Sequence, residues 1–196
     1  MIIWSFYTEG TEYEDEAAKL YESLVKLNLN RFIIEPVPNL GDWQLNVKQR
    51  VKLIRQLMEA RKESVLAVDC DATFCRKPDL DFDSLHCDIA AHVMDKAYWK
   101  QDISKHTHSL MGGTLFFPCE VRTLDLLYLW DKACENNPMW DQRILERVIK
   151  EHGFRLYELP AEYCCIDKTM WGIENPVIRH HQASRRLRKV INEISG

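Results

Sequence analysis

The chain has 196 residues, of which 46% are hydrophobic, so it is long enough for a domain with a sizeable core and too apolar to be disordered. Its formal net charge of −4 excludes a generally polybasic nucleic-acid-binding protein but leaves room for a local basic patch. Seven cysteines, an odd number without a Cys-x-x-Cys pair, argue against a zinc ribbon and favour reduced thiols in the cytoplasm. No apolar run reaches membrane-spanning length, so we expect no membrane segment.

The first part of the chain alternates strand and helix patterns. Thr11 and Glu14 form a capping-box pair at the start of the first helix. On the second helix Lys48, Arg50 and Lys52 lie off the apolar stripe, which favours solvated charges over phosphate ligands. Strands separated by helices predict right-handed crossovers and a parallel core. The expected elements are strand, helix, strand, helix and strand at 2–7, 11–29, 31–36, 46–60 and 64–68.

The second part mixes strands, helices and a long polar loop. Gly153 is expected to end the second of its helices, and Pro160 after the following strand predicts a sheet edge. We expect an irregular stretch from there to Pro176 and a terminal helix that carries the basic cluster 185–189. The expected strands lie at 88–93, 110–118 and 154–159, the helices at 120–136 and 138–152, the loop at 97–109 and an extended segment at 177–182.

Two aspartates follow the apolar run, as Asp69-Cys70-Asp71. In extended chain the side chains at i and i+2 point to the same side, so the two carboxylates are expected on one face, roughly 7 Å apart. Two carboxylates so placed repel each other unless a cation or donor lies between them. Mg2+ or Mn2+, held by few protein oxygens plus substrate phosphates, suits that need. The pair predicts a divalent-metal site, and two solvated acids that cap a turn are the plain alternative.

Adjacent histidines near the C-terminus offer a nitrogen ligand from a second part of the chain. In extended backbone His180 and His181 point to opposite sides, so at most one of them faces a site formed with the aspartates. Such a ligand set keeps positions open for substrate on a catalytic metal. A structural or exposed histidine pair is the alternative. Gly-x-Ser-x-Gly, Gly-x-Gly-x-x-Gly and phosphate-loop lysine motifs do not occur.

Taken in order, these features resemble a compact nucleotide-sugar glycosyltransferase of the GT-A fold. The shared pattern is a polar strand tip, a Trp-containing loop before a basic helix, an Asp-x-Asp strand end, a Gly-bearing strand, an Asp-Gln helix start and a late His before a basic segment. Here these are Tyr7-Thr8, Trp43 to Lys52, Val65 to Asp71, Gly112 to Phe116, Asp141-Gln142 and His180 to Arg185.

The resemblance implies an α/β fold with a mostly parallel, Rossmann-like central sheet flanked by helices, in a single domain that spans 1–196. Within it, 1–75 would be the nucleotide-binding half, and 85–196 the acceptor half with the basic tail. The implied activity is metal-dependent transfer of a sugar from a nucleoside diphosphate sugar, with a UDP-sugar as the expected donor and Mn2+ or Mg2+ as cofactor. The acceptor is a carbohydrate, a protein or a modified DNA base.

The resemblance also implies roles for individual residues. Asp69, Asp71 and His180 would hold the metal, with His180 preferred over His181 because the small residue Ala183 follows three positions later. Asp141 would be the catalytic carboxylate if the reaction inverts the anomeric centre, because an acceptor hydroxyl must then lose its proton. Donor-binding residues would be Tyr7, Thr8, Lys48, Arg50, Asp69, Ser184 and Arg185, and sugar- or acceptor-binding residues Gly112, Gly113, Trp140 and Gln142.

Two other interpretations stay open from sequence alone. Asp69-Cys70-Asp71-Ala72-Thr73 matches the Asp-x-Asp-x-Thr motif of haloacid-dehalogenase-type phosphatases, in which Asp69 would be the nucleophile, Asp71 the acid/base and Mg2+ the cofactor. That motif usually lies near the start of a chain, whereas here two strand-helix units precede it, and the later Gly-Asp-x-x-x-Asp motif is missing. The basic tail also suits a noncatalytic module that binds a nucleotide sugar or a nucleic acid.

Overall fold

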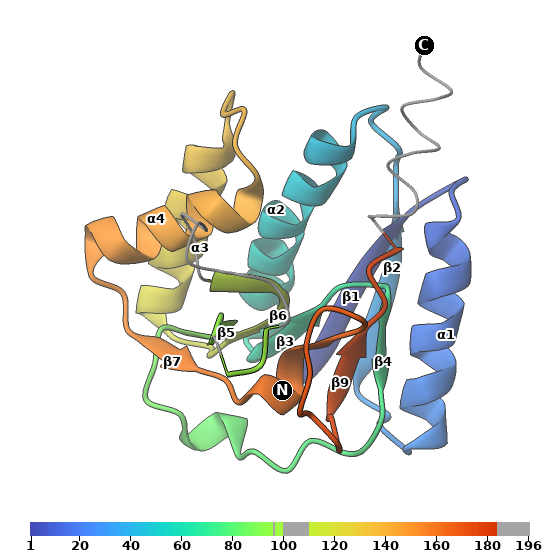
Figure 1. Cartoon of the computed structure of the whole chain (residues 1–196). Coiled ribbons are helices and arrows are strands. Elements are labelled where there is room, and N and C mark those ends of the chain that lie inside the picture. Colours follow the sequence, from blue (N-terminus) through green and yellow to red (C-terminus); the bar gives the residue numbers. More distant parts are fainter. Residues whose placement is uncertain (96, 100–109, 184–196) are drawn as a thin grey trace.

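The computed structural model of the chain describes residues 1–95, 97–99 and 110–183 (Figure 1). The strands are β1 (Ile2–Thr8), β2 (Phe32–Val37), β3 (Val65–Val68), β4 (Ala72–Phe74), β5 (Ile89–Val93), β6 (Leu110–Phe117), β7 (Leu156–Glu158), β8 (Cys165–Ile166) and β9 (Ile178–His180). The α-helices are α1 (Tyr13–Lys26), α2 (Trp43–Arg61), α3 (Val121–Cys134) and α4 (Asp141–His152), and two short 3-10 helices are η1 (Phe82–Ser84) and η2 (Ala161–Cys164).

Six strands form the central sheet, in the order β2-β1-β3-β6-β5-β7. β1 is parallel to β2 and β3, β5 is parallel to β7, and β6 is antiparallel to both of its neighbours. Every strand except β6 therefore runs the same way, which confirms the mostly parallel sheet. β7 lies at an edge, as Pro160 after it predicted.

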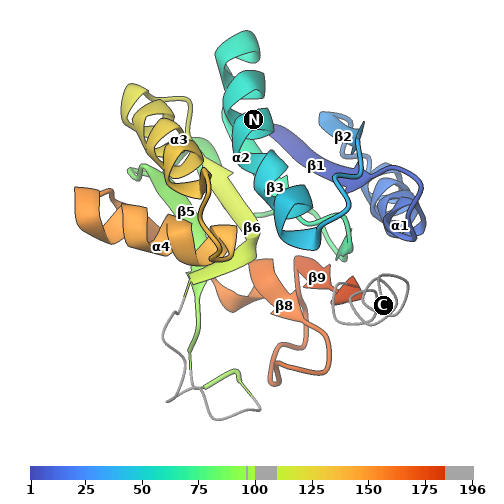
Figure 2. The ribbon, with the colours of Figure 1, turned by 90° about the horizontal axis from the view of Figure 1, so that it is seen from above.

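Side chains alternate between the two faces of this sheet, and each face has its own core. In β3, Val65 and Ala67 pack with α2, α3 and α4 on one face. Leu66 and Val68 pack with α1 and with the segments around β4 and η2 on the other face. Figure 2 shows α2, α3 and α4 together on one side and α1, β8 and β9 across the sheet from them. Because both faces are covered, the central strands are apolar on both sides, as the run before Asp69 indicated.

A second sheet of three short strands, in the order β4-β9-β8, was not predicted. β8 lies inside the stretch for which we expected irregular chain, so that expectation was wrong there. Strands of two or three residues are too short to show a period of two. This sheet matters for the site because β4 starts immediately after the two aspartates, and it pairs with β9 at Ala72 and His180.

The ends of the helices follow local hydrogen bonding. α2 begins at Trp43, three residues before the expected start, because the Asp42 carboxylate accepts a hydrogen bond from the Leu45 N–H at 2.9 Å. The expected capping box of α1 was wrong, since the Glu14 carboxylate accepts from the Gly10 N–H. Gly153 ends α4 with a φ of 64°, as predicted. In the described part of the chain, no helix combines the length and apolarity that a bilayer crossing requires.

A buried acid ties the start of β5 to α3 and β7, and it supplies a first prediction. The Asp88 carboxylate is fully buried and accepts hydrogen bonds from the Arg155 N–H at 2.8 Å and from the Arg122 side chain at 3.1 Å. Although burial acts against it, hydrogen bonds from Arg155 and Arg122 lower the pKa of Asp88. We expect Asp88→Asn to cost about 2 kcal/mol at pH 7, because both guanidinium groups are half-exposed and screened.

The pH dependence of that loss has a defined sign. A carboxyl group whose pKa is lower in the folded protein stabilises the fold above its unfolded pKa and loses this effect as pH falls. The free-energy difference between wild type and Asp88→Asn, measured by urea unfolding, should therefore shrink as the pH falls below about 4. A difference that stays constant down to pH 3 would contradict this account.

Candidate active site

The two aspartates lie at the carboxyl end of β3, where β6 begins beside it. They do not continue the strand, so the extended geometry that we expected was wrong. The Ala72 N–H donates to the Asp69 carbonyl at 3.0 Å, which makes Asp69 to Ala72 a tight turn. The Asp69 N–H in turn donates to the Gly113 carbonyl at 2.9 Å. The turn nevertheless brings the two carboxylates together at the edge of the sheet.

Asp69, Asp71 and His180 form a cluster whose potential ligand atoms all lie within 4.8 Å of one another. Pairing of β4 with β9 brings His180 there, and the Asp71 carboxylate accepts the Ala183 N–H at 2.7 Å. Asp69 is exposed, whereas Asp71 and His180 are buried. Burial raises the pKa of Asp71. The half-exposed Asp69 has its pKa raised by partial desolvation and by the charges of Asp71 and Asp141, and the charge of Arg50 opposes that rise. Crowding of this kind disfavours the charged forms of the two acids, and a cation placed between them would favour those forms.

The hydrogen bonds of His180 determine which ring nitrogen carries the proton. The Thr114 hydroxyl donates to the Tyr163 carbonyl at 2.7 Å, so its proton is used, and it must accept from His180 Nε2 at 2.9 Å. Nε2 is then protonated, and Nδ1 carries a lone pair. Burial lowers the pKa of His180 to about 4, so the ring is neutral at pH 7. Nδ1 is buried without a hydrogen-bond partner, 4.0 Å from the Asp71 carboxylate.

These groups fit a divalent cation. Two carboxylates and one neutral imidazole nitrogen are the ligand types of catalytic metal sites that leave positions open for substrate. The second ring nitrogen of a ligating histidine is normally held by a hydrogen bond, as Thr114 holds Nε2 here. The side chain of His181 points elsewhere: its Nδ1 lies 2.7 Å from Asp167 and its Nε2 lies 2.9 Å from the Thr73 hydroxyl.

Gly112 and Gly113 are needed because side chains press against their backbone. A Cβ at Gly113 would lie 2.9 Å from His180 Cε1. A Cβ at Gly112 would lie 2.9 Å from the Arg50 guanidinium and 3.0 Å from Gln142 Oε1. The resemblance assigned these two glycines to binding of the sugar or the acceptor. The structure shows that they admit His180, Arg50 and Gln142 against the start of β6.

Arg50 joins the metal-ligand cluster to the start of α4. Its Nε lies 2.6 Å from the Asp141 carboxylate, and its terminal NH1 lies 3.3 Å from Asp69 and donates to the Gly112 carbonyl at 2.9 Å. The guanidinium also lies over the Trp130 ring, 5.6 Å from its centre. Arg50 is buried, so the expectation of a solvated charge was wrong for this residue. Lys52 is exposed, and Lys48 donates to the Asn137 carbonyl.

The start of α4 carries three of the expected site residues. Asp141 is buried against Arg50. The Gln142 amide spans the first residues of β6, accepting from the Gly112 N–H at 3.0 Å and donating to the Leu110 carbonyl at 2.6 Å. Trp140 is partly exposed and packs edge-on against Trp43 with ring centres 6.1 Å apart. Asp141 and Gln142 therefore lie close to Arg50 at the start of β6, whereas the ring contact of Trp140 is with Trp43.

The remaining expected residues lie on the β1 side or outside the described chain. Tyr7 and Thr8 end β1, and the Thr8 carbonyl accepts the Thr11 hydroxyl at 2.6 Å. Ser184 and Arg185 fall outside the described residues, as does the basic cluster 185–189. Tyr13 was not predicted: burial raises its pKa, Trp43 is a hydrogen-bond partner, and both aspartates are close enough to act on it. Tyr13 is the first residue of α1, and nothing in the sequence distinguishes it from other residues of that helix.

The described residues thus define an α/β protein with an Asp-Asp-His cluster at the carboxyl edge of a mostly parallel sheet, the arrangement of a GT-A-like glycosyltransferase. The sequence matches the family described as nucleotide-diphospho-sugar transferase over residues 35–186, more than half of the chain. The chain belongs to this family, and it is a glycosyltransferase rather than a phosphatase or a noncatalytic module.

A solved structure supports the fold independently. It is the crystal structure of a glycosyltransferase involved in the glycosylation of the major capsid of PBCV-1, with a TM-score of 0.68 and 16% sequence identity. The match covers 97% of this chain and 99% of that chain. A comparison with curated proteins gives no match.

Proposed function

We propose that the protein transfers a sugar from a nucleoside diphosphate sugar in a metal-dependent reaction, with a UDP-sugar as donor and Mn2+ or Mg2+ held by Asp69, Asp71 and His180. The observation that carries the metal requirement is the buried His180 Nδ1, which has a lone pair, no partner and two carboxylates beside it. The family supplies the nucleotide-sugar donor. The cytoplasmic location that cysteine usage suggested remains part of this proposal.

Departure of a nucleoside diphosphate builds negative charge on the leaving oxygen, which a bound divalent metal stabilises. Arg50 adds fixed positive charge next to Asp69 and orients that carboxylate. Lys48 and Arg50 were both candidates for binding the donor. Arg50 is the better supported, because its guanidinium donates to the Gly112 carbonyl beside the aspartates, whereas the Lys48 ammonium group donates to the Asn137 carbonyl. Tyr7 and Thr8 would meet the nucleotide base, and Ser184 and Arg185 stay predicted donor contacts. We propose that residues 1–75 form the nucleotide-binding half of the domain and that residues 85–196 form the acceptor half.

Gly112, Gly113, Trp140 and Gln142 border the side that we assign to the transferred sugar and the acceptor. Asp141 remains the candidate catalytic carboxylate of an inverting reaction, and its contact with Arg50 gives it the further task of holding the guanidinium. The acceptor is a carbohydrate, a protein or a modified DNA base. The similar viral structure is named for the glycosylation of a capsid, which is consistent with a protein acceptor.

Donor binding tests this proposal directly. The melting temperature should be followed with a panel of nucleoside diphosphate sugars, each with Mn2+, with Mg2+ and with chelator. A ligand at a hundred times its dissociation constant stabilises the fold by about 2.7 kcal/mol. We expect a shift with one nucleotide sugar that chelator abolishes. A shift that survives chelator would contradict the metal requirement, and no shift with any nucleoside diphosphate sugar would contradict the proposed donor.

Gly113→Ala should weaken metal binding although no metal ligand is itself substituted. The new methyl group would lie 2.9 Å from the His180 ring, which is held by Thr114 and cannot retreat freely. We expect at least about a tenfold loss of Mn2+ affinity, about 1.4 kcal/mol, read from the Mn2+-dependent melting shift. Gly112→Ala, whose methyl group meets Arg50 and Gln142 but not His180, separates an effect that acts through His180 from one that acts through Arg50 on Asp69. Asp125→Asn, an exposed position on α3, is the control. Equal Mn2+ affinity in Gly113→Ala and wild type would contradict the placement of His180 in the metal site.

A further inference from the structure

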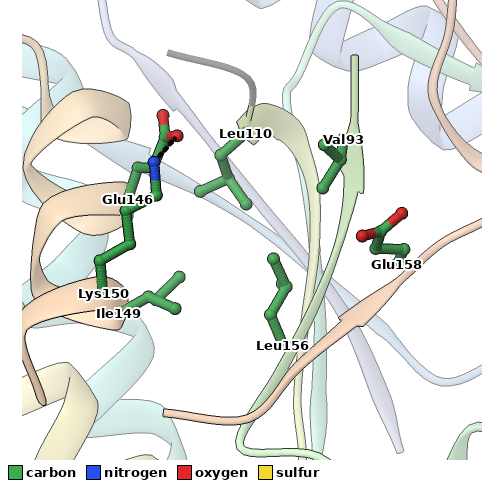
Figure 3. Close-up of a pocket in the computed structure, with 7 residues that line it drawn as sticks. All are labelled: Val93, Leu110, Glu146, Ile149, Lys150, Leu156 and Glu158. Atoms are coloured by element: carbon green, nitrogen blue, oxygen red, sulfur yellow. Dashed lines mark hydrogen bonds and ion pairs between the residues drawn. The ribbon is translucent and has the colours of Figure 1, made fainter. Parts of the chain in front are cut away.

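A cavity of about 180 Å³ lies between α4 and the ends of β5, β6 and β7 (Figure 3). Its walls combine four aliphatic side chains with three charged ones. The aliphatic residues are Val93, Leu110, Ile149 and Leu156, and the charged residues are Glu146, Lys150 and Glu158. In Figure 3 the aliphatic side chains surround the space, and Glu146 and Lys150 meet each other on its α4 side.

The cavity continues the active site along β6 and α4. The Leu110 carbonyl accepts the Gln142 amide, the Gln142 oxygen accepts the Gly112 N–H, and the Gly112 carbonyl accepts Arg50. One residue of β6 thus separates the lining of the cavity from the backbone that holds Arg50. Asp141 and Gln142 open the same helix that presents Glu146, Ile149 and Lys150 to the cavity. The cavity is therefore on the acceptor side of the site, away from β1 and the nucleotide.

Its size and lining restrict what can enter. A cavity of roughly 150 Å³ holds one benzene molecule, so about 180 Å³ takes one side chain or one ring, not a chain of sugars. None of the described residues that line the cavity is aromatic, so they offer no face on which a sugar ring could stack. Aliphatic walls instead suit a methylene chain.

The charges around the opening favour a cation at the end of that chain. Glu146 and Lys150 form an ion pair at 2.7 Å, so their charges cancel. Glu158 is exposed, and in the described part of the chain its carboxylate has no ion pair, so the described lining residues carry one negative charge in excess. A lysine side chain buries its methylenes against apolar surface and keeps its ammonium group at the edge, where Glu158 would meet it.

The edge strand beside the cavity favours a peptide over a free amine. β7 ends the sheet, and Leu156 and Glu158, two residues apart, point to the same side and line the cavity. An extended peptide can add to such an edge by backbone hydrogen bonds and place alternate side chains in pockets. Building on the proposed transferase function, we propose that this cavity receives a lysine side chain of a protein acceptor near the hydroxyl that accepts the sugar.

Labelled peptides test the inference without donor. A set of short acetylated peptides would carry one threonine and one lysine one to four residues apart, and a matched set would carry norleucine, which keeps the stem and lacks the charge. Binding is read by fluorescence anisotropy. At one spacing we expect lysine to bind about tenfold more tightly than norleucine, about 1.4 kcal/mol. Glu158→Gln should reduce that preference to less than about threefold, while the exposed control Glu22→Gln on α1 should keep it.

Three results would overturn the inference. The first is equal binding of the lysine and norleucine peptides, and the second is a lysine preference that survives Glu158→Gln. The third is that no peptide binds, whereas a neutral oligosaccharide binds to the wild type and no longer binds to Glu158→Gln. The metal-dependent donor shift is measured on the same variants. Loss of peptide discrimination with an intact donor shift refutes only this acceptor assignment. Absence of the donor shift refutes the transferase proposal on which it rests.

Discussion

Asp71→Asn should remove metal-dependent turnover and leave the fold intact. Asp71 Oδ1 lies 4.0 Å from His180 Nδ1, and Oδ2 accepts the Ala183 N–H. An asparagine oxygen can still accept that N–H, but the amide supplies no negative charge to a cation. Loss of one electrostatic contact to a developing charge costs about 3 kcal/mol or more of the barrier, so turnover should fall at least roughly a hundredfold. Initial rates with Mn2+ at saturating donor measure this.

The stability of the same variant separates loss of function from loss of fold. Burial raises the pKa of Asp71, which means that ionising this carboxyl group costs more free energy in the folded protein than in the unfolded chain. An amide carries no such cost, so the metal-free variant should melt at or above the temperature of wild type at pH 7. The Mn2+-dependent rise should disappear. Asp125→Asn, an exposed position on α3, is the matched control. Wild-type rates in Asp71→Asn would contradict the metal site.

Much of the fold could be predicted because the strands and helices of the first half carry strong periodic patterns. The apolar run before Asp69 placed a central strand, and alternation with helices gave the parallel sheet. The pattern gave no sign of β4 and β8, and for β9 it predicted only an extended segment at 177–182, since two or three residues hold no period. Ala72 and His180 are 108 residues apart in sequence. Their pairing between β4 and β9 completes the cluster, and it belongs to the three-stranded sheet that was not predicted.

The site residues show the same division. Asp69, Asp71 and His180 were expected together from the resemblance, and the structure brings them together, though by a turn and not by extended chain. Thr114 was not predicted to act on His180, and a polar residue in the otherwise apolar strand β6 was the available signal. Arg50 was expected in solvent because helix periodicity compares apolar with polar residues. It cannot show that a charge off the apolar stripe meets two carboxylates contributed by other elements.

Arg50→Met should cost both stability and turnover, and these two effects can be separated. Asp141 is only 4% exposed, so removing the guanidinium leaves its carboxylate buried without a cation. Breaking a buried ion pair in this way costs about 3–5 kcal/mol. It also releases Asp69 and the Gly112 carbonyl, which Arg50 holds. Urea unfolding should show the loss, whereas Lys52→Met, an exposed position on the same helix, should unfold like wild type.

The double variant Arg50→Met/Asp141→Leu distinguishes a structural ion pair from a functional one. Replacing both partners by apolar side chains removes the unpaired charge, so most of the lost stability should return. Turnover should stay low, because neither the positive charge beside Asp69 nor the Asp141 carboxylate has been restored. A fold that tolerates the apolar pair but cannot turn over would mean that the buried charges are kept for the reaction. Recovery of turnover together with stability would instead remove Arg50 and Asp141 from the donor and acceptor machinery and leave them as core residues.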